Sequence, residues 1–243
     1  LLVSPYGDLT LEEKQKATRV LLEAGADIRE LNTVRKHLSG IKGGRLAQQA
    51  FPAKIVSFIL SDVIGDPLDV IASGPTAPDG SSYGDAVAVI NRYSLRQKMP
   101  PKVIDILLQG ARGDIPETPK AGDPVFGNVE NMIIGNNKTA IEAARVKAVS
   151  LGYEAVILAS DLHGEAREAG AHLAVEALKI RGNAGRGKCL IAGGETTVKV
   201  TGSGRGGRNM ELALAFAREI KGCLDITLLS AGTDGTDGPT DAA

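Results

Sequence analysis

The apolar and polar positions along the chain form two kinds of pattern. Short apolar runs rich in β-branched residues are typical of strands, and longer segments with apolar residues three and four positions apart are typical of amphipathic helices. The helical pattern predicts helices over residues 11–24, 28–39, 44–50, 82–92, 101–110, 138–150, 163–181 and 208–221. The apolar runs predict strands over residues 54–60, 129–134, 153–159, 188–192, 196–201 and 224–230.

Capping motifs mark the start of the first two predicted helices. Thr10 and Asp27 are each followed three residues later by a glutamate, Glu13 and Glu30. This spacing is that of a capping box, in which each side chain bonds the backbone amide of the other residue. A glycine follows the end of each of these helices, as expected for a C-terminal cap.

The order of the elements indicates the fold class. Strands alternate with helices in the second half of the chain, which is typical of an α/β/α sandwich with a largely parallel sheet. Residues 54–60 (KIVSFIL) form a nearly continuous apolar run and predict a buried parallel strand. Residues 113–127 are rich in Pro and Gly and indicate a linker. We therefore expect an α/β protein of two three-layer α/β/α domains with largely parallel sheets, residues 1–127 and 128–243.

The two ends of the chain are unusual for a complete protein. The sequence opens at Leu1 without a methionine and stops at Ala243, inside a loop rich in glycine, aspartate and threonine. We expect a fragment that lacks sequence at both ends, so that the first domain is incomplete and the second is truncated.

Composition and charge exclude several classes of protein. The formal net charge is -1, and aromatic residues make up 3% of the chain. Near-zero charge argues against a nucleic-acid protein held by bulk electrostatics, and few aromatics leave little surface for base stacking. No apolar stretch is long enough for a transmembrane helix. The two cysteines, Cys189 and Cys223, each begin an apolar run, which favours reduced thiols in a cytoplasmic protein.

A glycine-rich stretch over residues 201–209 (TGSGRGGRN) lies between a predicted strand and a predicted helix. Free amides, the helix dipole and the two arginines Arg205 and Arg208 together predict an anion site, most simply for phosphate. A flexible glycine hairpin is the alternative. The stretch also matches G-x-G-x-x-G, but a dinucleotide fold needs an acid at the end of the next strand. Asp225 lies at the beginning of that strand, so we do not expect the dinucleotide fingerprint to hold.

Aspartates follow two of the predicted strands. Asp234, Asp237 and Asp241 lie in the loop after residues 224–230, where they could hold Mg²⁺ or orient a hydroxyl, or simply form turns. Their spacing does not fit an EF-hand. Asp62 follows residues 54–60, where α/β enzymes place a metal ligand or a base.

A basic segment over residues 35–45 (RKHLSGIKGGR) has two interpretations. Lys36 and His37 could form a solvated basic face at a helix C-terminus, where cations complement the dipole. Alternatively, Lys42, directly before Gly43 and Gly44, could point at a phosphate. Glycines that cradle phosphate, cationic side chains and loop aspartates together favour a nucleotide-using transferase. No P-loop motif is present.

Four segments read together resemble the glycerate 2-kinase family with a MOFRL-type C-terminal domain. They are 31–46 (LNTVRKHLSGIKGGRL), 61–75 (SDVIGDPLDVIASGP), 193–211 (GGETTVKVTGSGRGGRNME) and 233–243 (TDGTDGPTDAA). The resemblance implies a Rossmann-like first domain, a MOFRL-type region from about residue 188, and an active site in the cleft between the domains. It also implies ATP-dependent phosphorylation of D-glycerate at the 2-hydroxyl, with Mg²⁺, to give 2-phosphoglycerate.

The resemblance implies roles for particular residues. Asp62, Arg205 and Asp234 are expected to be catalytic, and Asp62, Asp234 and Asp237 to be metal ligands. The residues expected to bind substrate or nucleotide phosphate are Lys42, Gly43, Gly44, Gly204, Gly206, Gly207, Arg208 and Asn209. Family members carry a catalytic lysine in a segment before Leu1, so we expect this chain alone to be catalytically impaired.

Two other functions stay open at this point. One is a hydroxypyruvate reductase that uses NAD(P)H, and the other is an anion-binding module without turnover. The sequence predicts no membrane or nucleic-acid partner and leaves a homodimer open.

Overall fold

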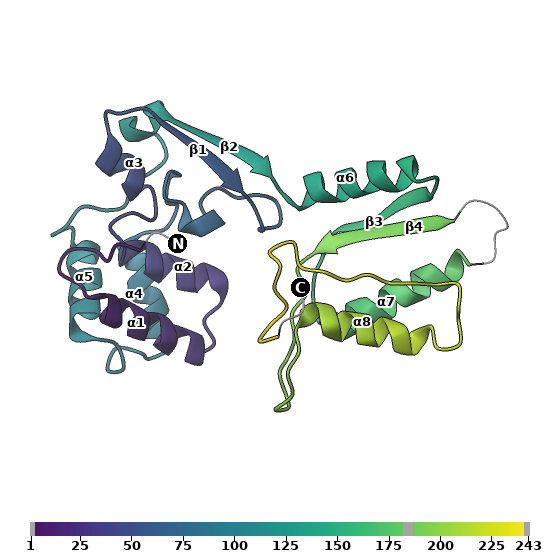
Figure 1. Cartoon of the computed structure of the whole chain (residues 1–243). Helices are drawn as coiled ribbons and strands as arrows, with labels where there is room; N and C mark the ends of the chain where they lie inside the picture. The colour runs from purple at the N-terminus through teal and green to yellow at the C-terminus, as the bar shows by residue number, and fades with distance from the viewer. Residues whose placement is uncertain (1–2, 182–186, 241–243) are drawn as a thin grey trace. The chain divides into compact units, whose positions relative to one another are not determined.

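The computed structural model describes residues 3–181 and 187–240, which form two compact units, Leu1–Asn136 and Asn137–Ala243 (Figure 1). The boundary lies nine residues after the one expected from the sequence, 127/128, because the strand at 129–135 pairs within the first unit. In the described ranges no helix has the length and apolar character needed to cross a membrane.

The first unit is built mainly from helices. They are α1 (Leu11–Glu23), α2 (Ile28–His37), α3 (Arg45–Ala50), α4 (Tyr83–Arg92) and α5 (Pro101–Arg112), with short 3₁₀ turns at Ile71–Ser73 and Pro124–Asn128. Both predicted capping boxes are present, at Thr10 and at Asp27. Helices α1, α2, α4 and α5 enclose one apolar core, whose largest fully buried side chains include Leu21, Val34, Leu38, Tyr83, Val103 and Leu107.

Two parallel strands complete the first unit. β1 (Ile55–Leu60) pairs with β2 (Val129–Gly135), with Ile55 opposite Val129. The parallel pairing agrees with the prediction, but the expected burial is wrong, since Phe58 and Leu60 are 67% and 74% exposed. In the described part of the chain β1 has a single strand neighbour, and burial alternates along it, so one face is left open.

The segment predicted as a linker packs on the first unit through its central residues, Thr118 and Pro119, which are buried. Thr118 is almost fully buried, and the Pro119 carbonyl accepts a hydrogen bond of 3.0 Å from the Asp79 amide. The linker prediction over 113–127 is therefore wrong. Pro and Gly there shape a packed loop and do not mark a boundary between domains.

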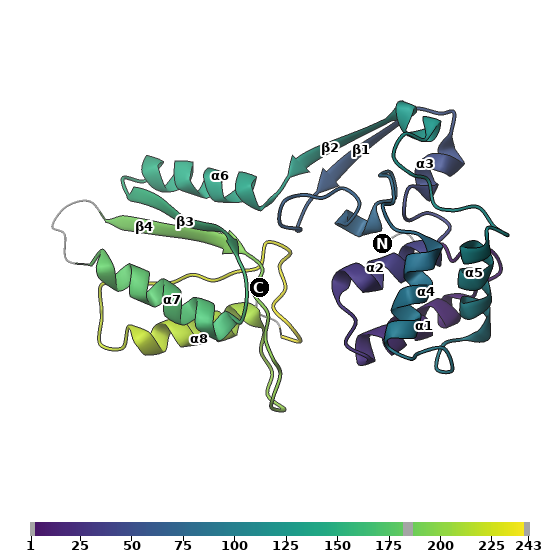
Figure 2. The same ribbon diagram turned by 180° about the vertical axis from the view of Figure 1, so that it is seen from behind.

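The second unit has three layers (Figures 1 and 2). Its elements are α6 (Asn137–Ser150), β3 (Glu154–Leu162), α7 (Ala166–Lys179), β4 (Lys188–Gly194) and α8 (Arg208–Glu219). β3 and β4 are parallel, with α6 on one face of the pair and the packed helices α7 and α8 on the other. The α/β class predicted from the alternating pattern is confirmed.

Two predicted strands of the second unit do not form. In residues 196–201 only Thr197 makes a bridge, to Glu165, and residues 224–230 join no ladder in the described part of the chain. Leu224 and Leu229 are 99% and 88% exposed. A strand is defined by backbone hydrogen bonds to a neighbouring strand, and apolar composition alone does not provide that neighbour.

Candidate functional site

The N-terminus of α8 is capped by Asp237. The two carboxylate oxygens of Asp237 accept hydrogen bonds of 2.9 Å from the amides of Asn209 and Met210, and the side chain is buried. A Cβ at Gly207 would lie 2.3 Å from the Asp237 carboxyl carbon, so this position requires glycine. The protein's own carboxylate therefore occupies the place at the helix terminus where the sequence predicts a phosphate. Each oxygen of Asp237 thus already accepts one amide hydrogen bond, and its metal role stays a prediction.

The polar side chains around this cap differ in whether they already have a partner within the protein. Arg208 Nη1 donates to Glu195 at 2.7 Å, whereas Arg205 is exposed and, among the described residues, makes no ion pair. Asn209 Oδ1 accepts from the Ser230 hydroxyl at 2.9 Å, and its buried Nδ2 has no partner in the described part. Arg205 is thus an exposed cation of this loop that has no ion pair among the described residues, and Asn209 Nδ2 is a buried donor without an acceptor there.

The remaining glycines and aspartates of the prediction lie on the surface. Gly204 is exposed with open space around it, and Gly206 is half-buried. Asp234 is exposed, and hydrogen bonds from the Thr236 amide and hydroxyl lower the pKa of its carboxyl. Asp62 is also exposed and follows β1 in the first unit. No group of three or more His, Cys, Asp or Glu side chains in the described ranges could hold a metal ion.

Lys42, Gly43 and Gly44 form a turn that docks on residues 72–75. The amides of Gly43 and Gly44 donate to the carbonyls of Ser73 and Gly74 at 2.9 and 2.7 Å. Both glycines have positive φ, +61° and +82°, which explains their residue type. Both amides therefore already have hydrogen-bond acceptors within the first unit, and this geometry gives no support to the predicted phosphate contact.

The Lys42 ammonium is turned inward as well. Lys42 is buried, and its Nζ donates to the Ala72 carbonyl at 2.7 Å. Burial and the nearby charge of Arg35 lower the pKa of the Lys42 ammonium. Its phosphate-binding role stays a prediction.

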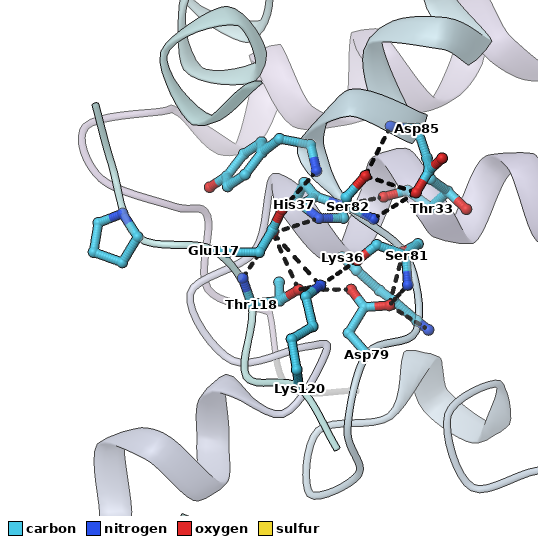
Figure 3. Close-up of polar contacts among 12 residues, drawn as sticks. Thr33, Lys36, His37, Asp79, Ser81, Ser82, Asp85, Glu117, Thr118 and Lys120 are labelled. Atoms are coloured by element: carbon cyan, nitrogen blue, oxygen red, sulfur yellow. Dashed lines mark hydrogen bonds and ion pairs between the residues drawn. The ribbon is translucent and has the colours of Figure 1, made fainter. Parts of the chain in front are cut away.

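A network of buried polar groups lies beside this turn, at the C-terminal end of α2 (Figure 3). Lys36 Nζ lies 3.2 Å from Asp79 Oδ1, and Thr118 Oγ1 donates to the other oxygen of Asp79 at 3.1 Å. Burial by itself would raise the pKa of Asp79, but hydrogen bonds from Ser81 and the charge of Lys36 outweigh it, so that the pKa is lowered.

His37 and Glu117 form the second half of the network. His37 is fully buried, with Nδ1 2.7 Å from the Thr33 carbonyl oxygen and Nε2 2.9 Å from Glu117 Oε1. Burial acts to raise the pKa of Glu117, but hydrogen bonds from His37 and from the amides of Tyr83 and Thr118 lower it to about 2. The network ties α2, α4 and the 113–127 segment together.

The sequence does not predict this network. The interpretation of Lys36 and His37 as a solvated basic face is wrong, because both are buried and paired. Their partners lie 43 and 80 residues away in the sequence. The sequence does contain the two acidic partners, in the segments 76–79 (TAPD) and 117–118 (ET). Nothing in the local pattern connects either segment to α2.

Comparison with known proteins places the chain in a family. The family described as "Domain of unknown function (DUF4147)" matches residues 1–108, and the MOFRL family matches residues 188–243. A glycerate kinase of Macaca fascicularis is 43% identical, and the match covers 100% of this chain and 71% of that protein. The chain belongs to the glycerate kinase family.

Other relatives in the glycerate kinase family extend the picture. A glycerate kinase of Bos taurus is 43% identical over 100% of this chain and 54% of its own length. A D-glycerate 2-kinase of Thermotoga maritima is 47% identical over 98% of this chain and 55% of its own length. The chain thus spans about half the length of these two relatives.

A crystal structure and a differently named relative complete the comparison. The crystal structure of glycerate kinase from Thermotoga maritima superposes with a TM-score of 0.82 and 47% identity, covering 98% of this chain and 55% of that one. A protein of Agrobacterium vitis whose name proposes a hydroxypyruvate reductase is 44% identical over 100% of this chain and 54% of its own length.

Proposed function

We propose that this chain is the part of a glycerate kinase that takes part in ATP-dependent phosphorylation of D-glycerate at its 2-hydroxyl, giving 2-phosphoglycerate. The observation that carries the proposal is the 47% identity to a D-glycerate 2-kinase across 98% of the chain. Catalysis of phosphoryl transfer depends mainly on cationic groups around the phosphate and on a correctly positioned acceptor hydroxyl. The exposed Arg205 offers such a cationic group.

Arg205 is the residue proposed to contact the transferring phosphate, because it is exposed and free of ion pairs among the described residues. Gly204, Gly206, Arg208 and Asn209 are proposed to line the nucleotide or substrate beside it. The unpartnered Asn209 Nδ2 supports this assignment, since a buried donor without an acceptor is costly until a ligand supplies one.

Asp62 and Asp234 are proposed for the acceptor hydroxyl or for Mg²⁺. Magnesium takes one or two carboxylates together with substrate phosphates and waters, so exposed single carboxylates fit it without a preformed cluster. When bound, Mg²⁺ neutralises phosphate charge. Asp234 accepts from Thr236, which holds its carboxyl ionised and oriented.

A hydroxypyruvate reductase is the second candidate, favoured by the similarity to the Agrobacterium vitis protein. Two observations weigh against it. The G-x-G-x-x-G stretch over residues 202–207 follows no strand ladder, and Asp225 forms an ion pair with Arg181 at 2.9 Å. Asp225 thus already has an arginine partner.

We further propose a cytoplasmic location. Cys189 and Cys223 are both free thiols, as expected in a reducing compartment.

A chimera tests the function. This chain replaces the matched part of the Thermotoga maritima D-glycerate 2-kinase, and ADP release is followed with D-glycerate and Mg-ATP. NADH oxidation with hydroxypyruvate is followed in parallel. ADP release alone supports the kinase, NADH oxidation alone supports the reductase, and a folded chimera with neither activity supports a binding module.

Arg205→Ala in the same chimera is expected to abolish ADP release, because the phosphate loses its cation. Arg19→Ala, a change at another exposed arginine, is the matched control and should leave turnover unchanged. Circular dichroism shows whether both variants fold. Turnover of a folded Arg205→Ala variant at the parent rate removes Arg205 from the mechanism.

A further inference from the structure

Both ring nitrogens of the buried His37 face hydrogen-bond acceptors (Figure 3). Nδ1 lies 2.7 Å from the Thr33 carbonyl oxygen, and Nε2 lies 2.9 Å from Glu117 Oε1. A carbonyl oxygen and an ionised carboxylate accept hydrogen bonds and donate none. A neutral imidazole has one N–H and can satisfy only one of these acceptors, whereas an imidazolium has two and satisfies both. The geometry therefore requires a charged ring wherever Glu117 is ionised.

The contacts of Glu117 keep its carboxyl group ionised. Oε1 also accepts from the Thr118 amide at 2.8 Å, and Oε2 accepts from the Tyr83 amide at 2.9 Å. Burial acts to raise the pKa of Glu117, but the hydrogen bonds from His37 and from these two amides lower it to about 2. Glu117 therefore has no proton to donate to Nε2, and the second ring proton belongs to His37.

The groups around the ring also favour a positive charge on it. The charge of His37 acts on three carboxylates, and the Tyr83 ring lies beside it with 4.5 Å between the ring centroids. The neighbouring cations already have partners: an acid for each lysine, and the Tyr83 hydroxyl for the arginine. The titratable and charged groups that face the ring are Glu117 and Lys120 of the 113–127 segment, Asp79, Tyr83 and Asp85 of α4, Lys36 of α2 and Arg45 of α3.

We propose that His37 is an imidazolium in the folded chain and forms a pH-sensitive clamp, which holds Glu117 on α2 and loosens when the ring loses its proton. A neutral ring that keeps its Nδ1 proton points the Nε2 lone pair at the Glu117 carboxylate, so attraction gives way to repulsion. The hydrogen bonds of Asp79 with Thr118 and Pro119 do not involve His37 and remain. The clamp therefore loosens around Glu117 without freeing the whole segment.

The place of His37 in the chain gives the clamp something to act on. His37 is the last residue of α2, and the chain leads from it into the turn of Lys42, Gly43 and Gly44, for which the sequence predicts a phosphate contact. A pH-dependent end of α2 is a property of the first unit alone. Its test requires no turnover and is independent of the proposed kinase activity.

The first measurement is the protonation of the three histidine rings in the 243-residue chain, by ¹⁵N NMR of histidine-labelled protein over a pH series. His163 and His172 are exposed and give reference titrations in the same spectra. His37 should keep both ring protons at a pH at which the two reference rings have lost one. A His37 ring that loses a proton together with the references, or before them, overturns the proposal.

The second measurement is hydrogen exchange at the Tyr83 and Thr118 amides, which both donate to Glu117. Once His37 has lost its proton, the protection factors of these two amides should fall by about tenfold. The Asp79 amide, which donates to the Pro119 carbonyl, is the internal control and should keep its protection. No change at Tyr83 and Thr118, or an equal change at all three amides, overturns the clamp.

Glu117→Gln tests the cause of the charge. Glutamine can donate to a neutral Nε2, so His37 in this variant should lose its proton together with the reference rings. Glu23→Gln, at an exposed glutamate, should leave the titration of His37 as in the parent chain. A parental titration of His37 in folded Glu117→Gln overturns the proposal. If Glu117→Gln does not fold, His37→Gln replaces it, and a pH-dependent loss of protection at Thr118 that persists without the histidine then overturns the clamp.

Discussion

Buried polar groups in the first unit are of two kinds, paired and unpaired, and they act on stability in opposite directions. Lys36 and His37 are paired with Asp79 and Glu117, and these pairs fix the end of α2. Lys14 has no partner in the described part of the chain. Breaking a buried pair leaves an uncompensated charge, whereas removing an unpaired charge relieves a cost.

Glu117→Gln is expected to remove an acid-sensitive contribution to stability. The folded-state pKa of Glu117 is about 2, below its ordinary value of 4.5, so the contribution is complete above pH 4.5 and is lost as pH falls towards 2. The variant should unfold about 1 kcal/mol more easily at pH 7, and the difference should vanish near pH 2. Urea unfolding at a series of pH values measures it. Glu23→Gln, at an exposed glutamate, should show no such pH-dependent difference; a constant difference for Glu117→Gln would contradict the role of its charge.

Lys14→Met is expected to stabilise the chain in chloride buffer by about 1 kcal/mol or more at pH 7. The folded-state pKa of Lys14 is about 8, against 10.5 for a free lysine. Between these values the unfolded chain binds more protons than the folded one, so the parent gains stability as pH rises and the advantage of the variant shrinks. Denaturant midpoints from pH 7 to 10.5 check this. A destabilised Lys14→Met variant at pH 7 would show that the ammonium has a partner in the protein.

At the scale of elements, local signals predict helices better than strands. Capping boxes at Thr10 and Asp27 act within four residues, and both helices begin where these motifs predict. Residues 196–201 and 224–230 have strand-like composition but no strand beside them in the described part. Pairing is a long-range property, and no local pattern reveals a missing neighbour.

Asp237→Ala is expected to destabilise the second unit by roughly 2 kcal/mol, because two amides at the start of α8 lose their acceptor. Chemical unfolding followed by circular dichroism measures the loss. Asp234→Ala, in the same loop but exposed, should change stability far less. Adding Mg²⁺ is expected to change the stability of the parent and of the variant equally. Stabilisation of the parent alone by Mg²⁺ would identify Asp237 as a metal ligand.

Gly170→Ala is expected to loosen the contact between α7 and α8. The added Cβ would lie 2.3 Å from the Leu212 carbonyl oxygen, and backbone cannot yield cheaply, so a loss of about 1 to 3 kcal/mol follows. Gly84→Ala provides the matched helical control. A Cβ there meets only a Ser82 hydroxyl at 3.5 Å, so it should stabilise slightly. Equal unfolding midpoints for the two variants would contradict the close packing of α7 on α8.

At the scale of the molecule, sequence motifs identify the family, whereas only the structure shows what each motif residue contacts. The motifs that carry the resemblance are long and unusual, and the 43% identity to the macaque glycerate kinase confirms the family. The same motifs did not reveal what their residues contact. Gly43 and Gly44 serve a docked turn, and Asp237 serves a helix cap.

The sequence by itself determined the α/β class, the starts of the first two helices and the family, because periodicity, capping and motif identity are encoded within short stretches. Only the tertiary structure decided which charges are buried and which are paired. Lys36 meets Asp79, and His37 meets Glu117, across separations of 43 and 80 residues, while Lys14 is left without a partner among the described residues. Those outcomes depend on how distant segments pack, and the free energy of a buried charge depends on its neighbours in space.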